Sequence, residues 1–131
     1  MILLLETVHP DAAARLAEAA EVRLVADPPA LDDTWSDGVE AVVTRGLGRI
    51  DAAAIGRLRD LRVVARCGAG LDNIDTDAAA RAGVAVVHAP GVTATAVAEA
   101  ATMLMLAAAR RLPTLERAVS DGNWSVRQGY E

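Results

Sequence analysis

The chain of 131 residues contains no lysine and no phenylalanine, and it has a single cysteine, Cys67, and two histidines. Without lysine there can be no Schiff-base lysine and no phosphate-binding loop of the lysine type. One cysteine and two histidines exclude a disulfide framework and a Cys/His metal site. The net charge of -5 argues against nucleic acid as a partner.

Long apolar runs are also missing, so we expect no membrane-spanning helix. The apolar start, MILLLETVHP, has no basic leader and is interrupted by Glu6, which favours a first strand over a signal peptide. The composition, 53% hydrophobic and 24% charged, is too apolar for a disordered tail. We therefore expect a folded, soluble, cytoplasmic protein.

Short apolar runs alternate with alanine-rich stretches through residues 1–92. Strands that are apolar throughout and alternate with helices indicate a parallel sheet covered on both faces. The pattern predicts an open three-layer α/β unit, with an irregular crossing at 30–38. The expected strands are 2–8, 22–26, 40–44, 62–67 and 84–87, and the expected helices are 11–20, 51–58 and 76–83, capped by Asp51 and by Asp75 or Thr76.

Residues 93–131 have a different character. A helix expected over 95–111 is apolar or small on nearly every side, then Pro113 interrupts and a further helix is expected over 115–122. A helix that is apolar all round must be buried on more than one side. This stretch therefore predicts contact with another domain or another chain.

Glycine-bearing loops follow three of the expected strands, at 45–48, 68–72 and 89–95. Ligands of open parallel sheets bind at the carboxyl ends of the strands. Glycines allow successive backbone N–H groups to converge on an anion without help from lysine. These loops are the candidate site for a carboxylate or a phosphate.

Two loops come close to a dinucleotide-binding fingerprint, but each lacks its third glycine. Asp51 stands in that position in the loop 46–51, and Asn73 does so in 68–73. An aspartate there would repel a pyrophosphate, so tight turns and helix caps are the better interpretation. The acidic residues of 72–77 have the wrong spacing for calcium, and we expect no metal site.

Several single residues allow both a structural and a chemical interpretation. His88 is expected to bond the backbone, because no acid is near enough in sequence to orient a general base, and His9 is expected to have a structural role. Cys67 is expected to be a small, buried side chain that fills space in the core. Thr93 and Thr95 most simply cap the following helix, whose amino end could alternatively hold a phosphate.

Several longer segments of the sequence together resemble a known protein family. The segments 62–75, 82–86 and 96–99, together with Pro90, resemble the D-isomer-specific 2-hydroxyacid dehydrogenases, over about residues 40–131. The resemblance implies a two-domain NAD-dependent enzyme that moves hydride between nicotinamide and a 2-hydroxy or 2-keto acid. Residues 1–92 would be its flavodoxin-like substrate-binding lobe, and 93–131 its helices crossing into a Rossmann NAD-binding domain.

The resemblance also implies roles for individual positions. Backbone amides of Ala69 and Gly70, shaped by Gly68, would hold the substrate carboxylate, and the Arg45–Gly46 turn would line the same cleft. Thr93, Thr95 and Val97 would lie on the cofactor side. The family's glycine fingerprint and its catalytic arginine, glutamate and histidine would all follow Glu131, so this chain is expected to carry no catalytic residue.

Two hypotheses follow. In the first, the chain is the substrate-binding part of such a dehydrogenase, inactive alone, with one face of the lobe left uncovered. In the second, it is a stand-alone, non-catalytic dimerising or regulatory module of the same fold. In both, residues 95–120 are expected to contact either the missing Rossmann domain or a second copy in a homodimer.

Overall fold

The computed structural model describes residues 1–25, 31, 35 and 37–129. The chain divides into two compact units, Met1–Val92 and Thr93–Glu131, and each is treated by itself. Most of the crossing expected at 30–38, and the end of the strand expected at 22–26, lie outside the described residues.

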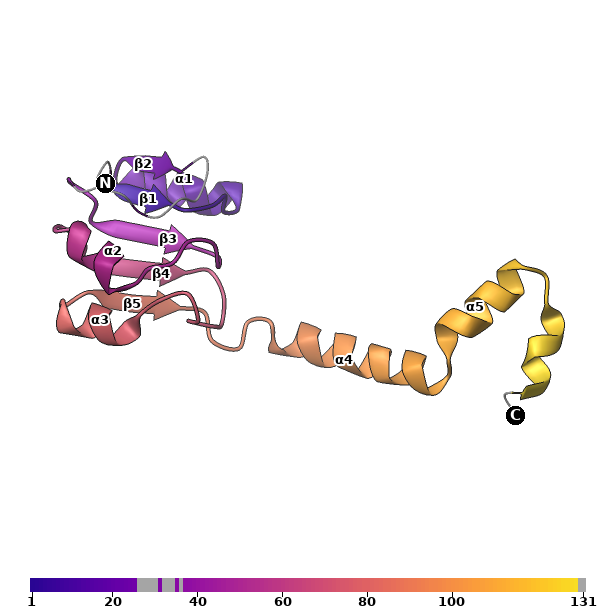
Figure 1. The fold of residues 1–131 in the computed structure, drawn as a ribbon. Helices are drawn as coiled ribbons and strands as arrows, with labels where there is room; N and C mark the ends of the chain where they lie inside the picture. The colour runs from indigo at the N-terminus through magenta and orange to yellow at the C-terminus, as the bar shows by residue number, and fades with distance from the viewer. Residues whose placement is uncertain (26–30, 32–34, 36, 130–131) are drawn as a thin grey trace. The chain divides into compact units, whose positions relative to one another are not determined.

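The first unit is built on a five-stranded sheet in which every neighbouring pair of strands is parallel. The spatial order is β2-β1-β3-β4-β5, the doubly wound order of flavodoxin-like folds. This confirms the α/β architecture expected from the alternating apolar runs (Figure 1). The strands are β1 (Ile2–Leu4), β2 (Val22–Leu24), β3 (Ala41–Thr44), β4 (Val63–Arg66) and β5 (Ala85–His88).

Three helices connect these strands: α1 (Pro10–Ala19), α2 (Ala52–Arg57) and α3 (Thr76–Arg81). Both predicted caps are present, because the Asp51 carboxylate accepts the Ala54 amide at 3.0 Å and the Asp75 carboxylate accepts the Ala78 amide at 2.8 Å. A left-handed Gly83 with φ of 72° follows α3, a conformation that costs glycine little. The sequence thus determines where α2 and α3 begin.

Alternate residues along the strands enter two separate apolar clusters, as the pleat of a strand requires. One face of the sheet carries Leu3, Val42 and Val64, all fully buried, against residues of α2 and α3. The other face carries Ile2, Leu4 and Val43, against Leu16 of α1 and Ala20. Helices therefore cover both faces, and burying each large aliphatic side chain stabilises the fold by about 1.5–3 kcal/mol.

The second unit consists of α4 (Ala94–Ala109), α5 (Leu112–Ser120) and the 3-10 segment η2 (Trp124–Gly129). Pro113 lies in the first turn of α5, where a missing N–H is tolerated, so it begins this helix rather than preceding it. The capping role expected of Thr93 is wrong, because Thr93 is the N-cap residue of α4 but its side chain makes no capping hydrogen bond. Its αR backbone differs from the extended conformation typical of capping side chains.

The side chains of α4 are exposed in spite of their apolar character. Val97, Met103, Leu104, Met105 and Leu106 are each between 60% and 65% exposed. Within the described residues, no helix is both long enough and apolar enough to cross a membrane.

Candidate functional site

The predicted loops meet at the carboxyl ends of β3, β4 and β5. The Cys67 amide donates to the Thr44 carbonyl at 2.7 Å, which ties the end of β4 to the end of β3. The Ala89 amide donates to the Gly68 carbonyl at 3.0 Å, which ties the end of β5 to the same loop. A Cβ built on Gly68 would lie 3.8 Å from the carbonyl oxygen of Arg45. The structure thus brings the 45–48 and 68–72 loops together.

A short bridge outside the sheet holds the two loops in register. The Ile50 amide donates to the Asn73 carbonyl and the Asp75 amide to the Ile50 carbonyl, each at 2.9 Å. The Asn73 side-chain amide donates to the Gly48 carbonyl at 2.9 Å. Gly48 cannot be replaced easily, because its φ is 78° and an added Cβ would stand 2.7 Å from Leu5 Cδ1. The 45–48 and 68–72 loops are consequently held together where the chain leads into α2 and α3.

The first loop already holds an anion supplied by the chain itself. Glu6 follows β1, and its Oε1 accepts the three successive amides of residues 45, 46 and 47 at 2.5, 2.7 and 2.8 Å. The Thr44 hydroxyl lies 2.7 Å from the Leu47 carbonyl oxygen and 3.1 Å from the same Glu6 oxygen, and its single proton can be donated to either acceptor. Successive amides converging on one oxygen form an anion nest.

Hydrogen bonding also sets the charge of Glu6. Burial of the carboxylate raises its pKa, but the hydrogen bonds from the amides of Leu47, Arg45 and Gly46 and from Thr44 together outweigh burial and lower the pKa below 4.5. The Glu6 side chain is therefore negatively charged at neutral pH. Sequence reasoning missed this residue, although a charged side chain directly after a buried strand is a signal for the carboxyl edge.

The second loop keeps its amides free. Among the described residues, no acceptor takes the N–H of Ala69 or of Gly70. The Ala69 carbonyl is held instead by His88 Nδ1 at 2.9 Å. Since the peptide is trans, the N–H of Gly70 points away from that carbonyl and toward the side that His88 does not occupy.

A guanidinium lies beside these free amides. Arg66 ends β4, its side chain is only 13% exposed, and its Nη2 stands 3.5 Å from Asp72 Oδ1. The Nε of Arg66 is buried and has no hydrogen-bond partner among the described residues. Its terminal nitrogens approach Gly46 and Gly68, where a Cβ would lie 3.5 Å from Nη2 and Nη1 respectively. This residue was also missed from sequence, where nothing distinguished it from twelve other arginines.

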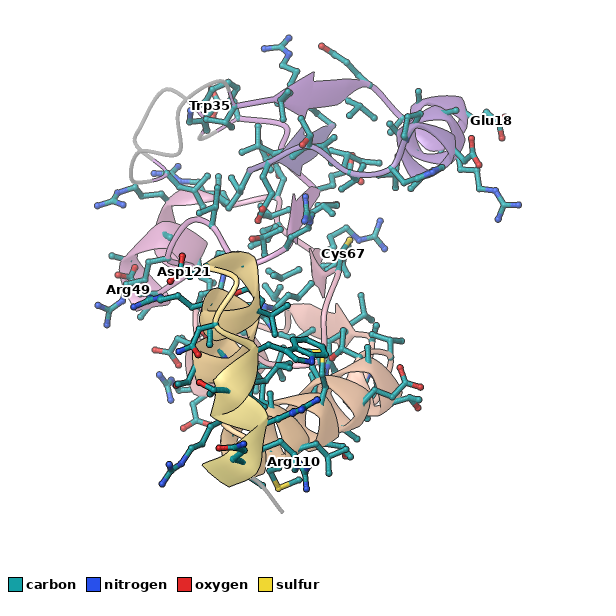
Figure 2. The ribbon with its side chains drawn as sticks, turned by 90° about the vertical axis from the view of Figure 1, so that its right-hand side faces the viewer. Glu18, Trp35, Arg49, Cys67, Arg110 and Asp121 are labelled. Carbon is teal, nitrogen blue, oxygen red and sulfur yellow. The ribbon has the colours of Figure 1, made fainter. Side chains whose placement is uncertain are left out.

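The expectations for the two histidines are confirmed, and the expectation for Cys67 is wrong. His88 bonds the backbone as predicted. His9 has the structural role expected of it, because its Nδ1 accepts the Asp11 amide at 3.2 Å in front of α1. Cys67 is exposed, so the expectation of buried filling is wrong. The reason is that β4 ends at Arg66, and Cys67 enters the loop beyond the packed part of the sheet (Figure 2).

In the loop 46–51 the structure has the helix cap that the sequence predicted, and the loop's amides are not available to a pyrophosphate. The amides of the 45–47 loop are taken by Glu6, and the carboxylate of Asp51 is the cap of α2. Thr93, Thr95 and Val97 belong to the second unit and are exposed. No group of three or more histidine, cysteine, aspartate or glutamate side chains gathers there to hold a metal, within the described ranges.

Two surface hollows lie among the described residues of the first unit. A shallow hollow of about 590 Å³ lies at the amino ends of β1, β3 and β4, lined by Ile2, Ala41 and Val63. A smaller one of about 200 Å³ lies beside residues 49–51 and 72–75. Ligands of open parallel sheets bind at the carboxyl edge, which lies opposite the first hollow and carries the free amides and the Arg66 guanidinium.

One known protein family matches nearly the whole chain. A model of the D-isomer specific 2-hydroxyacid dehydrogenase catalytic domain matches residues 2–126. The chain belongs to this family. D-3-phosphoglycerate dehydrogenase of Archaeoglobus fulgidus is 45% identical over 89 residues, covering 68% of this chain and 17% of that protein. The enzyme of the same name from Mycobacterium bovis is 35% identical over 126 residues, covering 95% of this chain and 24% of that protein.

Solved structures of the dehydrogenase family have the same fold. A glyoxylate reductase from Paecilomyes thermophila superposes with a TM-score of 0.77 at 28% identity, over 94% of this chain and 42% of that one. An NADPH-dependent glyoxylate/hydroxypyruvate reductase from Sinorhizobium meliloti, solved with NADP and malonate, superposes with a TM-score of 0.75 at 28% identity, over 99% and 40%. The chain spans less than a third of the length of the curated relatives it matches.

Proposed function

We propose that this chain is the substrate-binding portion of an NAD-dependent D-2-hydroxyacid dehydrogenase of the phosphoglycerate-dehydrogenase type, and that it has no turnover alone. In the complete enzyme, nicotinamide exchanges a hydride with C2 of a 2-hydroxy or 2-keto acid. The present residues bind and orient that acid. Family membership supports the reaction class, and the free amides of Ala69 and Gly70 beside Arg66 carry the assignment of the binding role.

The substrate carboxylate would accept hydrogen bonds from the Ala69 and Gly70 amides. Arg66 supplies positive charge next to them from a partly desolvated position, where an ion pair is stronger than in water. Arg45 adds an exposed guanidinium from the neighbouring loop, with Nη1 donating to the Thr7 carbonyl at 3.4 Å. Charge-assisted bonds of this kind fix orientation, which is the contribution expected of a positioning lobe.

The cofactor side is proposed at the start of α4. Thr93, Thr95 and Val97 are exposed, and in the complete enzyme they would face the dinucleotide-binding domain. NAD is the expected cofactor from the resemblance. The amides of residues 45–47 are already bonded to Glu6, so NAD is not expected to bind tightly to this chain.

Titration of the ¹⁵N-labelled chain with D-glycerate tests the binding role. We expect saturable shifts of the Ala69 and Gly70 amide resonances, with glycerol as the matched ligand that lacks a carboxylate. If D-glycerate moves these resonances no more than glycerol does, the binding proposal is wrong.

The exposed apolar side chains of α4 favour a second candidate, a non-catalytic module that dimerises through residues 95–120. Sedimentation of the purified chain separates the two. A discrete, cooperatively unfolding dimer that does not bind D-glycerate would support the module. A chain that binds D-glycerate, whether monomeric or self-associating, would support the substrate-binding lobe.

A further inference from the structure

Glu6 occupies the place in the first loop that an external carboxylate would otherwise take. Its Oε1 accepts the amides of residues 45, 46 and 47, which lie 39 to 41 positions away in sequence. Gly46 therefore stands between two charges, because its amide faces the Glu6 carboxylate while Arg66 Nη2 lies 3.5 Å from the position of a Cβ on Gly46. The acidic side chain ties β1 to the loop that carries Arg45.

We propose that Glu6 is a positioning residue, the built-in anion of the 45–47 loop, which holds Arg45 at the carboxyl edge of the sheet and directs the substrate carboxylate to Ala69 and Gly70. The part that concerns substrate rests on the proposed function. The part that concerns the loop stands on the hydrogen bonds alone.

The geometry explains why two similar loops would behave differently toward anions. Both present successive amides at the same edge of the sheet, but those of 45–47 converge on Glu6 whereas those of 69–70 have no acceptor among the described residues. A second carboxylate at 45–47 would meet a filled nest and a like charge. Specificity for one orientation of a substrate then comes partly from blocking the alternative.

Removing the charge should open the blocked nest. In Glu6→Ala the three amides lose their shared acceptor, and a small carboxylate of the right size can replace it. In Glu6→Gln a neutral carbonyl oxygen remains, and neutral acceptors bind amides about half as strongly as ionised ones. A residue that only braced the fold would change stability in these variants without creating a new anion site.

The experiment follows the amide resonances of the ¹⁵N-labelled chain during titration with acetate. The control is Glu18→Gln, because Glu18 is an exposed acid on α1 (Figure 2). In the unmodified chain and in the control, acetate should leave residues 45–47 unmoved. In Glu6→Ala, acetate at millimolar concentration, the scale expected of a weak small-ligand site, should shift the resonances of 45–47 saturably toward their positions in the unmodified chain. Absence of such a shift in a folded Glu6→Ala chain would overturn the proposal.

Hydrogen exchange provides a measurement that needs no variant, should Glu6→Ala fail to fold by circular dichroism. In the unmodified chain, the Gly46 and Leu47 amides should exchange at least about tenfold more slowly than those of Ala69 and Gly70, because only the first pair is hydrogen-bonded. Equal exchange rates would count against the proposal. Failure of D-glycerate to shift Ala69 and Gly70 would refute the proposed function alone, since acetate rescue at 45–47 does not involve that pair.

Discussion

The guanidinium of Arg66 lies directly against the backbone of Gly70. A Cβ built on Gly70 would stand 2.8 Å from Arg66 Nη1 and 2.8 Å from Asp72 Oδ1, both closer than real Cβ contacts. Any side chain at position 70 must therefore displace the guanidinium or the carboxylate. Glycine at position 70 therefore allows the Arg66 guanidinium to approach the free amides of residues 69 and 70.

Gly70→Ala should weaken carboxylate binding while leaving the fold intact. The atoms that the methyl group meets belong to the ends of flexible side chains, so the cost in stability should stay under about 1 kcal/mol. Affinity for D-glycerate should fall about tenfold, which corresponds to about 1.4 kcal/mol. Chemical denaturation and NMR titration measure the two effects separately.

Gly56→Ala is the matched control for this substitution. Gly56 lies within α2, and an added Cβ would meet nothing within 4 Å. Alanine in a helix interior is favoured over glycine, so the free energy of unfolding should rise by about 0.5–1 kcal/mol. D-Glycerate affinity should not change, and a comparable loss in both variants would contradict the role given to Gly70.

Arg66→Met should lower the affinity for anionic ligands about tenfold or more, since it keeps much of the side-chain length but removes the charge. Arg49→Met is the comparison, because Arg49 lies at the same edge of the sheet with a side chain that is 86% exposed. If both substitutions reduce D-glycerate affinity equally, general surface charge rather than the Arg66 position is responsible.

His88→Phe should release the Ala69 carbonyl. A carbonyl only accepts hydrogen bonds, so His88 Nδ1 must carry the proton in this contact. The nitrogen resonances of the imidazole should accordingly show a protonated Nδ1. In the variant, the Ala69–Gly70 peptide should reorient more freely and D-glycerate binding should weaken. Unchanged Gly70 amide shifts would show that His88 does not orient this peptide.

The contribution of Glu6 to stability should depend on pH. Its pKa in the folded state lies below 4.5, because the amide hydrogen bonds outweigh the effect of burial. A lowered folded-state pKa stabilises the fold above the unfolded-state pKa, and this stabilisation disappears as pH falls through the folded value. Urea unfolding should therefore give a difference between the unmodified chain and Glu6→Gln that is constant near neutrality and shrinks below pH 4.5.

Taking that difference separates Glu6 from Asp51. The pKa of Asp51 is also lowered, mainly by the hydrogen bond from the Ala54 amide. Asp51 is present both in the unmodified chain and in Glu6→Gln, so its effect cancels in the difference. A difference that stays constant through the acid range would show that Glu6 is not held as a carboxylate by the loop.

The purified chain should not reduce NAD in the presence of D-glycerate or other 2-hydroxy acids. The residues described here that approach a substrate carboxylate are backbone amides and arginines, which position a substrate but do not take up a proton at neutral pH. Absorbance of NADH provides the measurement. Turnover that co-purifies with the chain and is lost in Arg66→Met would contradict the assignment.

The sequence by itself determined the architecture of the first unit. Strands apolar throughout can be stable only when both faces are covered, and Asp51 and Asp75 mark helix starts through local hydrogen bonds. Local rules also placed the glycine loops at the carboxyl edge. These inferences needed only residues close together in the chain.

Tertiary structure alone decided which amides are free and which are taken. Glu6 reaches the 45–47 loop across about 40 residues, and Arg66 is distinguished from other arginines only by its burial beside Gly70. Cys67 is exposed because β4 ends at Arg66, and only the assembled sheet shows where that strand stops contributing to the core. Hydrogen bonds between distant segments depend on the register of the assembled sheet, and no local pattern of residues contains that register.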